Sequence, residues 1–142
     1  MANIVELREM NDAKVEELLD DARETLFKLR FRSASAQLED YTQIKTARRE
    51  IAQFETVLNM RRKAAAAAAD EPAIAALLDG KDWTASVHFD YEESAYQVQF
   101  SDEDGADLAS ALVDLNKKKV NGRRARKEKP QPRQVISFEV AG

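Results

Sequence analysis

Two narrow stripes of apolar residues constrain the fold of this chain most strongly. The first stripe consists of Val15, Leu19, Ala22, Leu26 and Leu29. The second consists of Ile44, Ala47, Ile51, Phe54 and Leu58. Spacings of three and four residues place each set on one side of a helix, in a narrow seam typical of helices that pack in pairs. A short polar break at Ser33–Asp40 separates them, so the sequence predicts an antiparallel helical hairpin.

The start of the first predicted helix has a recognisable cap. Asn11 or Asp12 precedes the seam, and Glu16 and Glu17 follow early in the helix, where the helix dipole favours acidic side chains. The leading segment "IVELREM" is too short to be stable alone. We therefore expect it to form a short helix packed against the pair.

An alanine tract marks a boundary after the hairpin. Six consecutive alanines at 64–69 favour a helix but bury little surface, so we expect them to extend the second helix into solvent. Pro72 predicts a break close by. Residues 64–81 are interpreted as a helical spacer between a hairpin at 1–63 and a second part at 82–142.

The second part combines strand and helix patterns. Alternating apolar residues predict strands at Ala85–Tyr91 and Ala95–Phe100, with a last strand in "QVISFEV" that directs Ile136 and Phe138 to the core. Leucines at helical spacing predict a helix over Asp104–Lys117. The expected fold is mainly α in the N-terminal part, with a small α+β (ββαβ) extension. A basic arm at 117–133 joins its helix to its last strand.

Composition excludes several classes of chemistry. The 142 residues include no cysteine and one histidine, His88, which leaves no basis for thiolate sites, histidine-built metal sites or a Ser-His-Asp triad. In "SDEDG", a calcium loop would place Phe100 and Ala111 at ligand positions, so that motif fails. We expect no enzymatic activity and no cofactor. No membrane-spanning run or secretory signal is visible, so we expect a soluble cytoplasmic protein.

Charge is segregated along the chain. Residues 1–63 have no net charge, 64–116 carry net −11 and 117–142 carry net +7. On the second predicted helix, Lys45, Arg48 and Arg49 share one face. Further cations lie near the bend and at the far end of that helix: Lys28, Arg30, Arg32, Arg61, Arg62 and Lys63. This pattern fits a surface that binds nucleic-acid phosphates, and also a solvated face balanced by acids.

Four blocks, in order over residues 6–61, resemble a known family. They are Glu6-Leu7-Arg8, "ETLFKLRF" at 24–31, Gln37-Leu38 after a small-residue turn, and "RREIA" at 48–52 followed by "TVL" at 56–58. Together they resemble the bacterial type of the large-subunit ribosomal protein twenty-nine family. The departures are an inserted Thr25, Ser35-Ala36 in place of Thr-Gly, and Asp40-Tyr41 in place of Asn followed by Pro or Thr.

The resemblance implies a structural component of the large ribosomal subunit. It implies a hairpin on large-subunit ribosomal RNA near the exit of the nascent-peptide tunnel, beside other large-subunit proteins. Leu26, Leu29 and Leu38 would hold the hairpin closed. The candidate RNA-binding residues are Arg8, Lys28, Arg30, Arg32, Gln37, Lys45, Arg48, Arg49, Thr56, Arg61 and Arg62 in the hairpin, and Lys117, Lys118, Lys119, Arg123, Arg124 and Arg126 in the arm.

Three alternatives stay open at this point. The same seams fit a free-standing coiled-coil adaptor that dimerises through them. The basic arm fits threading against RNA phosphates, and equally a loop tethered to the acidic part of its own chain. We expect that acidic part to face solvent or a basic ribosomal protein. Phe27 and Phe31 lie off the seam, so we expect them to pack against the leading helix or a neighbouring protein.

Overall fold

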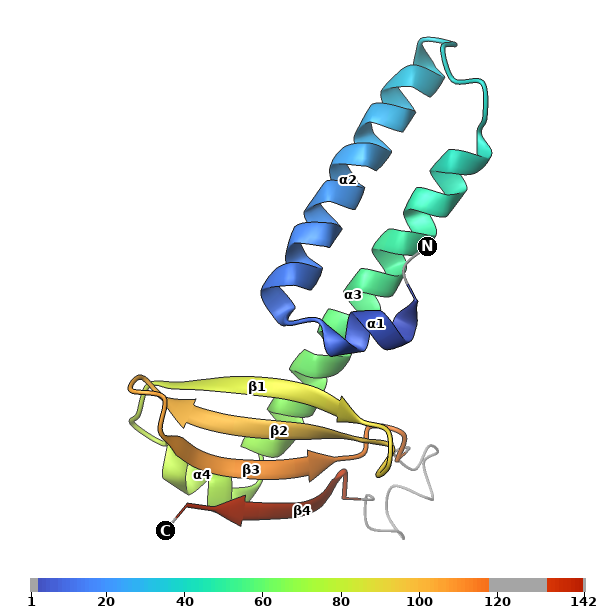
Figure 1. Ribbon diagram of the computed structural model, residues 1–142. Coiled ribbons are helices and arrows are strands. Elements are labelled where there is room, and N and C mark those ends of the chain that lie inside the picture. Colours follow the sequence, from blue (N-terminus) through green and yellow to red (C-terminus); the bar gives the residue numbers. More distant parts are fainter. Residues whose placement is uncertain (1–2, 118–132, 142) are drawn as a thin grey trace, which may run out of the picture. The chain divides into compact units, whose positions relative to one another are not determined.

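Residues 3–117 and 133–141 are described by the structure, a computed structural model (Figure 1). The chain divides into two compact units, Met1–Asn59 and Met60–Gly142. The helices are α1 (Ile4–Glu9), α2 (Asp12–Ala34), α3 (Thr42–Ala69) and α4 (Pro72–Leu78). The strands are β1 (Trp83–Asp90), β2 (Ala95–Asp102), β3 (Asp107–Val113) and β4 (Val135–Val140). The first unit is helical, the second holds an antiparallel sheet, and α3 contributes residues to both.

Polar side chains cap the two long helices at their first residues. The Asn11 side chain accepts a hydrogen bond from the amide of Lys14 at 2.9 Å, which confirms the predicted cap of α2. Before α3, the Asp40 carboxylate accepts from the hydroxyl of Thr42 at 2.6 Å and from its amide at 2.9 Å. These two hydrogen bonds hold the pKa of Asp40 below its usual range.

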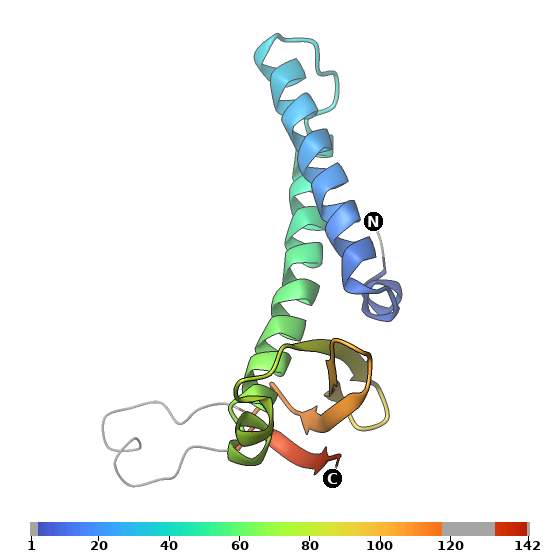
Figure 2. The same ribbon diagram turned by 90° about the vertical axis from the view of Figure 1, so that its left-hand side faces the viewer.

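The two seams pack against each other in an antiparallel hairpin, as predicted (Figures 1 and 2). The cluster farther from the bend contains Leu7, Val15, Leu19, Ala22, Phe54, Val57 and Leu58. The cluster nearer the bend contains Leu29, Leu38 and Ala47, with Leu26 and Ile44 partly buried. Leu7 of α1 is fully buried, which confirms that the leading helix packs on the pair.

The bend between α2 and α3 is closed by backbone hydrogen bonds around Ala36. The amide of Gln37 donates to the carbonyl of Arg32 at 2.9 Å, and the amide of Ala36 donates to that of Ser33 at 3.2 Å. This is the Schellman arrangement, which requires a left-handed residue after the helix. Ala36 adopts it with φ 56°, at a cost of about 1–2 kcal/mol for a residue other than glycine. The turn therefore forms without the glycine that is usual at this point.

The second unit contains a meander of four strands in the order β1-β2-β3-β4 (Figure 1). In β1 and β2, Val87 lies opposite Val98 and Phe89 opposite Tyr96, which confirms the predicted hairpin. Strand β3 places Ala111 opposite Val98. Partners in an antiparallel pair point to the same face, so the register defines one apolar face across the sheet.

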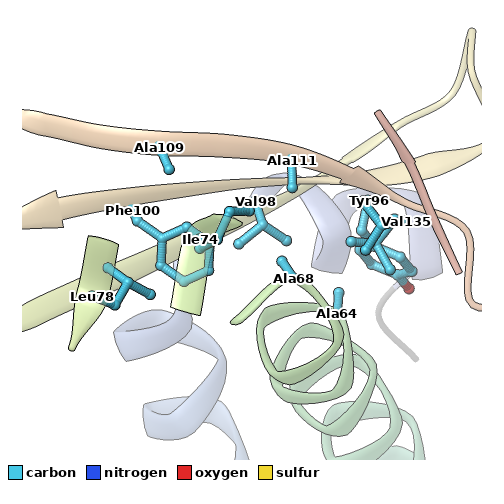
Figure 3. Close-up of a cluster of buried hydrophobic side chains, with 11 residues drawn as sticks. Ala64, Ala68, Ile74, Leu78, Tyr96, Val98, Phe100, Ala109, Ala111 and Val135 are labelled. Carbon is cyan, nitrogen blue, oxygen red and sulfur yellow. The ribbon is translucent and has the colours of Figure 1, made fainter. Parts of the chain in front are cut away.

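That apolar face packs on α4 and on the last turns of α3 (Figure 3). Figure 3 shows Phe100 beside Ile74 and Leu78, and Val98 above Ala68. Ala64 and Ala68 are fully buried, so the expectation that the alanine tract extends into solvent is wrong for these two residues. Their small side chains let the helix backbone approach the sheet closely, and this burial depends on the distant strands.

The predicted helix over Asp104–Lys117 is wrong, because the structure has strand β3 there, at Asp107–Val113. Among the residues that the structure describes, the order in this unit after α4 is ββββ, and not ββαβ. A hairpin turn precedes the strand: the Asp102 carboxylate accepts from the amide of Ala106 at 2.8 Å, and Gly105 has φ 83°. This turn directs the chain back along β2. Sheet pairing then overrides the helix propensity of the alanines and leucines.

The junction of α3 and α4 is fixed to the start of β4. Pro72 occupies the first turn of α4, a favoured position because its missing N–H would have no partner there. The sequence predicted the break at Pro72 but not this helix. Glu71 is buried and accepts from the guanidinium of Arg133, with Nε 3.3 Å from Oε2. The pair links two segments far apart in sequence.

Strand β4 lies in a shifted register at its start. An irregularity between Leu112 and Val113 places Val135 opposite Val113 in the core. Ile136 is 48% exposed, so its predicted place in the core is wrong. Phe138 lies opposite Ala111 but at the rim, where it is 38% exposed.

Candidate nucleic-acid interface

Helix α3 presents a strip of three exposed cations in the first unit. Lys45, Arg48 and Arg49 lie within about one turn of each other, on the side away from buried Ala47 and Phe54. Within residues 3–117 and 133–141, no carboxylate forms an ion pair with any of the three. The strip therefore consists of free donors with fixed positive charge, as phosphate contacts require.

Two other cations of this unit, Lys14 and Arg23, are balanced by nearby acids. Lys14 pairs with Glu17 at 2.7 Å, and this hydrogen bond raises the pKa of Lys14. Arg23 of α2 pairs with Glu55 of α3 at 2.9 Å and so bridges the two helices. Exposed ion pairs of this kind contribute little stability, but the carboxylate neutralises the charge of the cation. The contrast distinguishes the α3 strip from an ordinary solvated face.

The three cations near the end of α2 do not form one surface. Lys28 pairs with Glu24 at 2.5 Å, and that hydrogen bond holds the pKa of Glu24 below its usual range. Arg30 and Arg32 are exposed and free of ion pairs among the described residues. Two residues apart on a helix, they point to nearly opposite sides. A single flat surface therefore meets one of these arginines, not both.

Phe27 and Phe31 form an exposed aromatic pair on α2. They are 70% and 68% exposed, one helical turn apart. The leading helix packs instead at the other end of α2, through Leu7 against Val15. The expectation that it covers the two phenylalanines is therefore wrong. These rings were absent from the predicted site, although their position off the seam was a visible signal.

The remaining hairpin candidates differ in accessibility. Gln37 is exposed at the bend, and the Thr56 hydroxyl is already donated to the carbonyl one turn earlier at 2.6 Å. Arg62 is exposed and Arg8 half-buried, each with an interaction inside the chain. Arg61 is only 3% exposed, and this burial argues against a phosphate contact.

Most of the basic arm lies outside the described residues. Lys117 is exposed at its start. The candidates outside the described residues are Lys118, Lys119, Arg123, Arg124 and Arg126. At its other end, Arg133 is paired with buried Glu71 and is not a free cation.

The described residues contain no group of histidine and carboxylate side chains suited to holding a metal ion. None of the described helices combines the length and apolar character needed to cross a membrane.

Comparison with known proteins identifies the hairpin segment. Residues 5–61 match the family model of the ribosomal L29 protein. The large ribosomal subunit protein uL29 of Desulforudis audaxviator is 45% identical over 58 residues, covering 41% of this chain and 87% of the relative. The uL29 protein of Mycobacterium ulcerans is 40% identical over 77 residues, which cover 54% of this chain and 89% of the relative. The uL29 protein of Roseobacter denitrificans is 44% identical over 69 residues, which cover 49% of this chain and 98% of the relative. No solved structure matches the chain.

The matched segment is the helical unit that carries the strip of free cations. Nearly the full length of each relative is covered, so the likeness is to a whole protein rather than to a shared motif. Members of this family are structural ribosomal components and not enzymes. The chain belongs to the ribosomal L29 protein family.

Proposed function

We propose that this protein is a structural constituent of the large ribosomal subunit and that its hairpin binds large-subunit ribosomal RNA. Family membership supports the first part. The observation that carries the second is the free cation strip of Lys45, Arg48 and Arg49, beside neighbours whose charges are paired. Its place of action is then the cytoplasmic ribosome, and its role is in translation.

The mode of binding follows from the kind of groups on the strip. Lysine and arginine side chains that contact phosphates release condensed counterions, and this release drives binding without reading base sequence. Because the strip lies on the face of α3 opposite the seam, RNA bound there would leave the hairpin core undisturbed. We therefore assign the strip to positioning the hairpin on the RNA backbone, with Arg30 or Arg32 adding a contact near the bend.

A neighbouring protein is the second partner that we propose for the hairpin. Phe27 and Phe31 expose a large apolar area, and side chains of this kind are enriched at protein interfaces. We propose that this neighbour lies near the exit of the nascent-peptide tunnel, as the resemblance implies for the hairpin. Density for an intact subunit that shows the two rings in solvent would contradict this assignment.

The decisive experiment removes the strip while keeping the fold. Replacing Arg48 and Arg49 with alanine should weaken binding of the full chain to ribosomal RNA. The log–log salt slope should fall by up to about 0.9 for each lost contact. The matched control removes two paired cations, Lys14→Ala with Arg23→Ala, and should leave the slope nearly unchanged. Equal slopes for all variants would contradict a role of the strip in phosphate binding.

Sedimentation separates the proposal from the adaptor alternative. A ribosomal constituent co-sediments with large subunits on a sucrose gradient, whereas recovery only in light fractions would contradict the proposal. The structure also argues against the adaptor, because both seams are buried within one chain. A dimer through those seams would first have to open the hairpin.

The basic arm is a further RNA contact that we propose from its charge alone. Residues 117–133 contain nine Lys and Arg and one acid, and such segments suit threading along phosphates. Removal of 118–132 should then lower RNA affinity and its salt dependence. An unchanged salt slope would favour the alternative, a tether on the acidic unit.

A further inference from the structure

Strand β4 leaves one edge of the sheet unpaired within the described residues. It pairs with β3 alone, at the end of the strand order. The amide of Ala141 donates to the carbonyl of Leu108 at 2.9 Å. Amides alternate in direction along a strand, so those of Phe138 and Val140 point away from β3. The edge has no lysine or proline, the residues that commonly block further pairing.

The two faces beside this edge differ in character. On the side of the core, Phe138 and Val140 are 38% and 40% exposed and form an apolar rim. The other face carries a hollow of about 240 Å³, with Asp90, Ser137 and Glu139 among its lining residues. An extended chain added to β4 would thus meet apolar groups on one side and the carboxylate of Glu139 on the other.

Charge indicates what kind of chain fits. Residues 64–116, which include three of the four strands, carry net −11. We propose that β4 is the docking edge for an extended segment of another protein in which apolar residues alternate with lysine or arginine. Its backbone would pair with β4, its apolar side chains would cover Phe138 and Val140, and its cations would face Glu139. This goes beyond RNA binding by the hairpin and does not depend on it.

The same charge disfavours a second copy of this chain on the edge. Pairing β4 with β4 would bring two copies of the acidic stretch 64–116 together, and like charges across an interface oppose binding. A basic segment would instead be attracted by the same negative charge. The chain's own segment 118–132 is also basic, so the experiment must distinguish it from a partner.

The test uses the full chain and a synthetic nonapeptide of alternating valine and lysine. Binding is measured by calorimetry. Protection of the β4 edge is measured by hydrogen exchange of the Phe138 and Val140 amides. Two control peptides match it: one has glutamate for lysine, and one has the same residues in two blocks. Only the alternating valine–lysine peptide should bind and slow exchange at both amides. Equal binding of the block peptide would overturn the proposal, because charge alone would then suffice.

Two variants locate the binding on β4. Phe138→Lys should weaken peptide binding about tenfold, by removing an aromatic contact and adding a blocking charge. Ser86→Lys adds the same charge on β1, the other edge strand, and should weaken binding far less. Glu139→Gln keeps the side-chain shape and should reduce the salt dependence of binding. Unaltered emission from Trp83 verifies that each variant is folded.

Three further results would overturn the assignment. The first is equal loss of binding in Phe138→Lys and Ser86→Lys. The second is slow exchange of the Phe138 and Val140 amides in the free chain that is abolished by deleting 118–132, which would assign the edge to the chain's own arm. The third is a concentration-dependent dimer in sedimentation that Phe138→Lys disrupts, which would assign the edge to a second copy.

Discussion

Helix α3 contributes side chains of different size to two different hydrophobic cores. In the hairpin unit it contributes Phe54 and Leu58, which fill the space between two helices. In the sheet unit it contributes Ala64 and Ala68, over which the strands pack closely. The difference teaches that one continuous helix adapts to a helix or to a sheet through side-chain volume.

The two units also treat charge differently. The hairpin unit balances some cations with acids and leaves Lys45, Arg48 and Arg49 free on one face. The sheet unit is strongly acidic over 64–116, with net −11. A polyanion such as RNA is attracted to the first pattern and repelled by the second. The partners proposed for the cation strip of α3 and for strand β4 are accordingly of opposite charge.

The largest expected effect tests whether the two cores are independent. Phe100→Ala and Phe54→Ala each remove a buried ring and should each destabilise their unit by about 3–5 kcal/mol. Trp83, the single tryptophan, packs edge-to-face on Phe100 at 5.3 Å, so its emission reports the sheet unit. Helical circular dichroism reports mainly the hairpin. Each variant should lower mainly the transition of its own unit.

Coincident shifts of both signals in both variants would contradict that separation. The chain would then unfold as one cooperative body, and the comparison between two cores would describe packing but not stability. Gln99→Ala, an exposed change on the polar face of β2, serves as the control and should shift neither transition appreciably.

A smaller effect tests the role of side-chain volume in α3. Ala68→Leu inserts extra methyl groups between helix and sheet and should destabilise the sheet unit by about 1–3 kcal/mol. Ala66→Leu, on the exposed side of the same tract, is the matched control and should be near neutral. Denaturant unfolding followed by Trp83 emission measures both. Equal midpoints would contradict the argument that the alanines set the approach of the sheet.

In each unit, one substitution to glycine should stabilise the fold. Ala36 and Ser94 both have left-handed backbones, with φ 56° and 50°. Glycine relieves this strain but gains freedom in the unfolded chain, so Ala36→Gly should stabilise the hairpin by about 1 kcal/mol or slightly less. Ser94→Gly should act similarly on the sheet unit alone. Destabilisation by Ala36→Gly in thermal unfolding would show that the bend is not strained.

The smallest effect concerns pH and is confined to the hairpin. The pKa of Asp40 is lowered by its hydrogen bonds from Thr42, so its cap stabilises the fold above the unfolded pKa of about 3.9. That contribution is lost as pH falls through the lower pKa of the folded state. Asp40→Asn keeps a capping oxygen without the charge and should flatten the acid limb of the hairpin transition. Glu39→Gln is the neighbouring control.

The sequence by itself determined the elements whose pattern is local. The seams of α2 and α3 repeat every three or four residues, and Asn11 caps its own helix, so neither needs a distant partner to be recognised. The alternation in β1 and β2 defines a hairpin for the same reason. The family blocks also lie within this locally readable part.

Tertiary structure alone decided the features that depend on distant contacts. The segment of β3 fits a helix or a strand locally, and its pairing with β2 selects the strand. Ala64 and Ala68 become core residues only because the sheet lies over them. Likewise, charge spacing did not reveal that Lys28 is paired and Lys45 free, since ion pairing depends on three-dimensional distances. Local periodicity specifies elements, whereas burial and pairing are properties of the assembled fold.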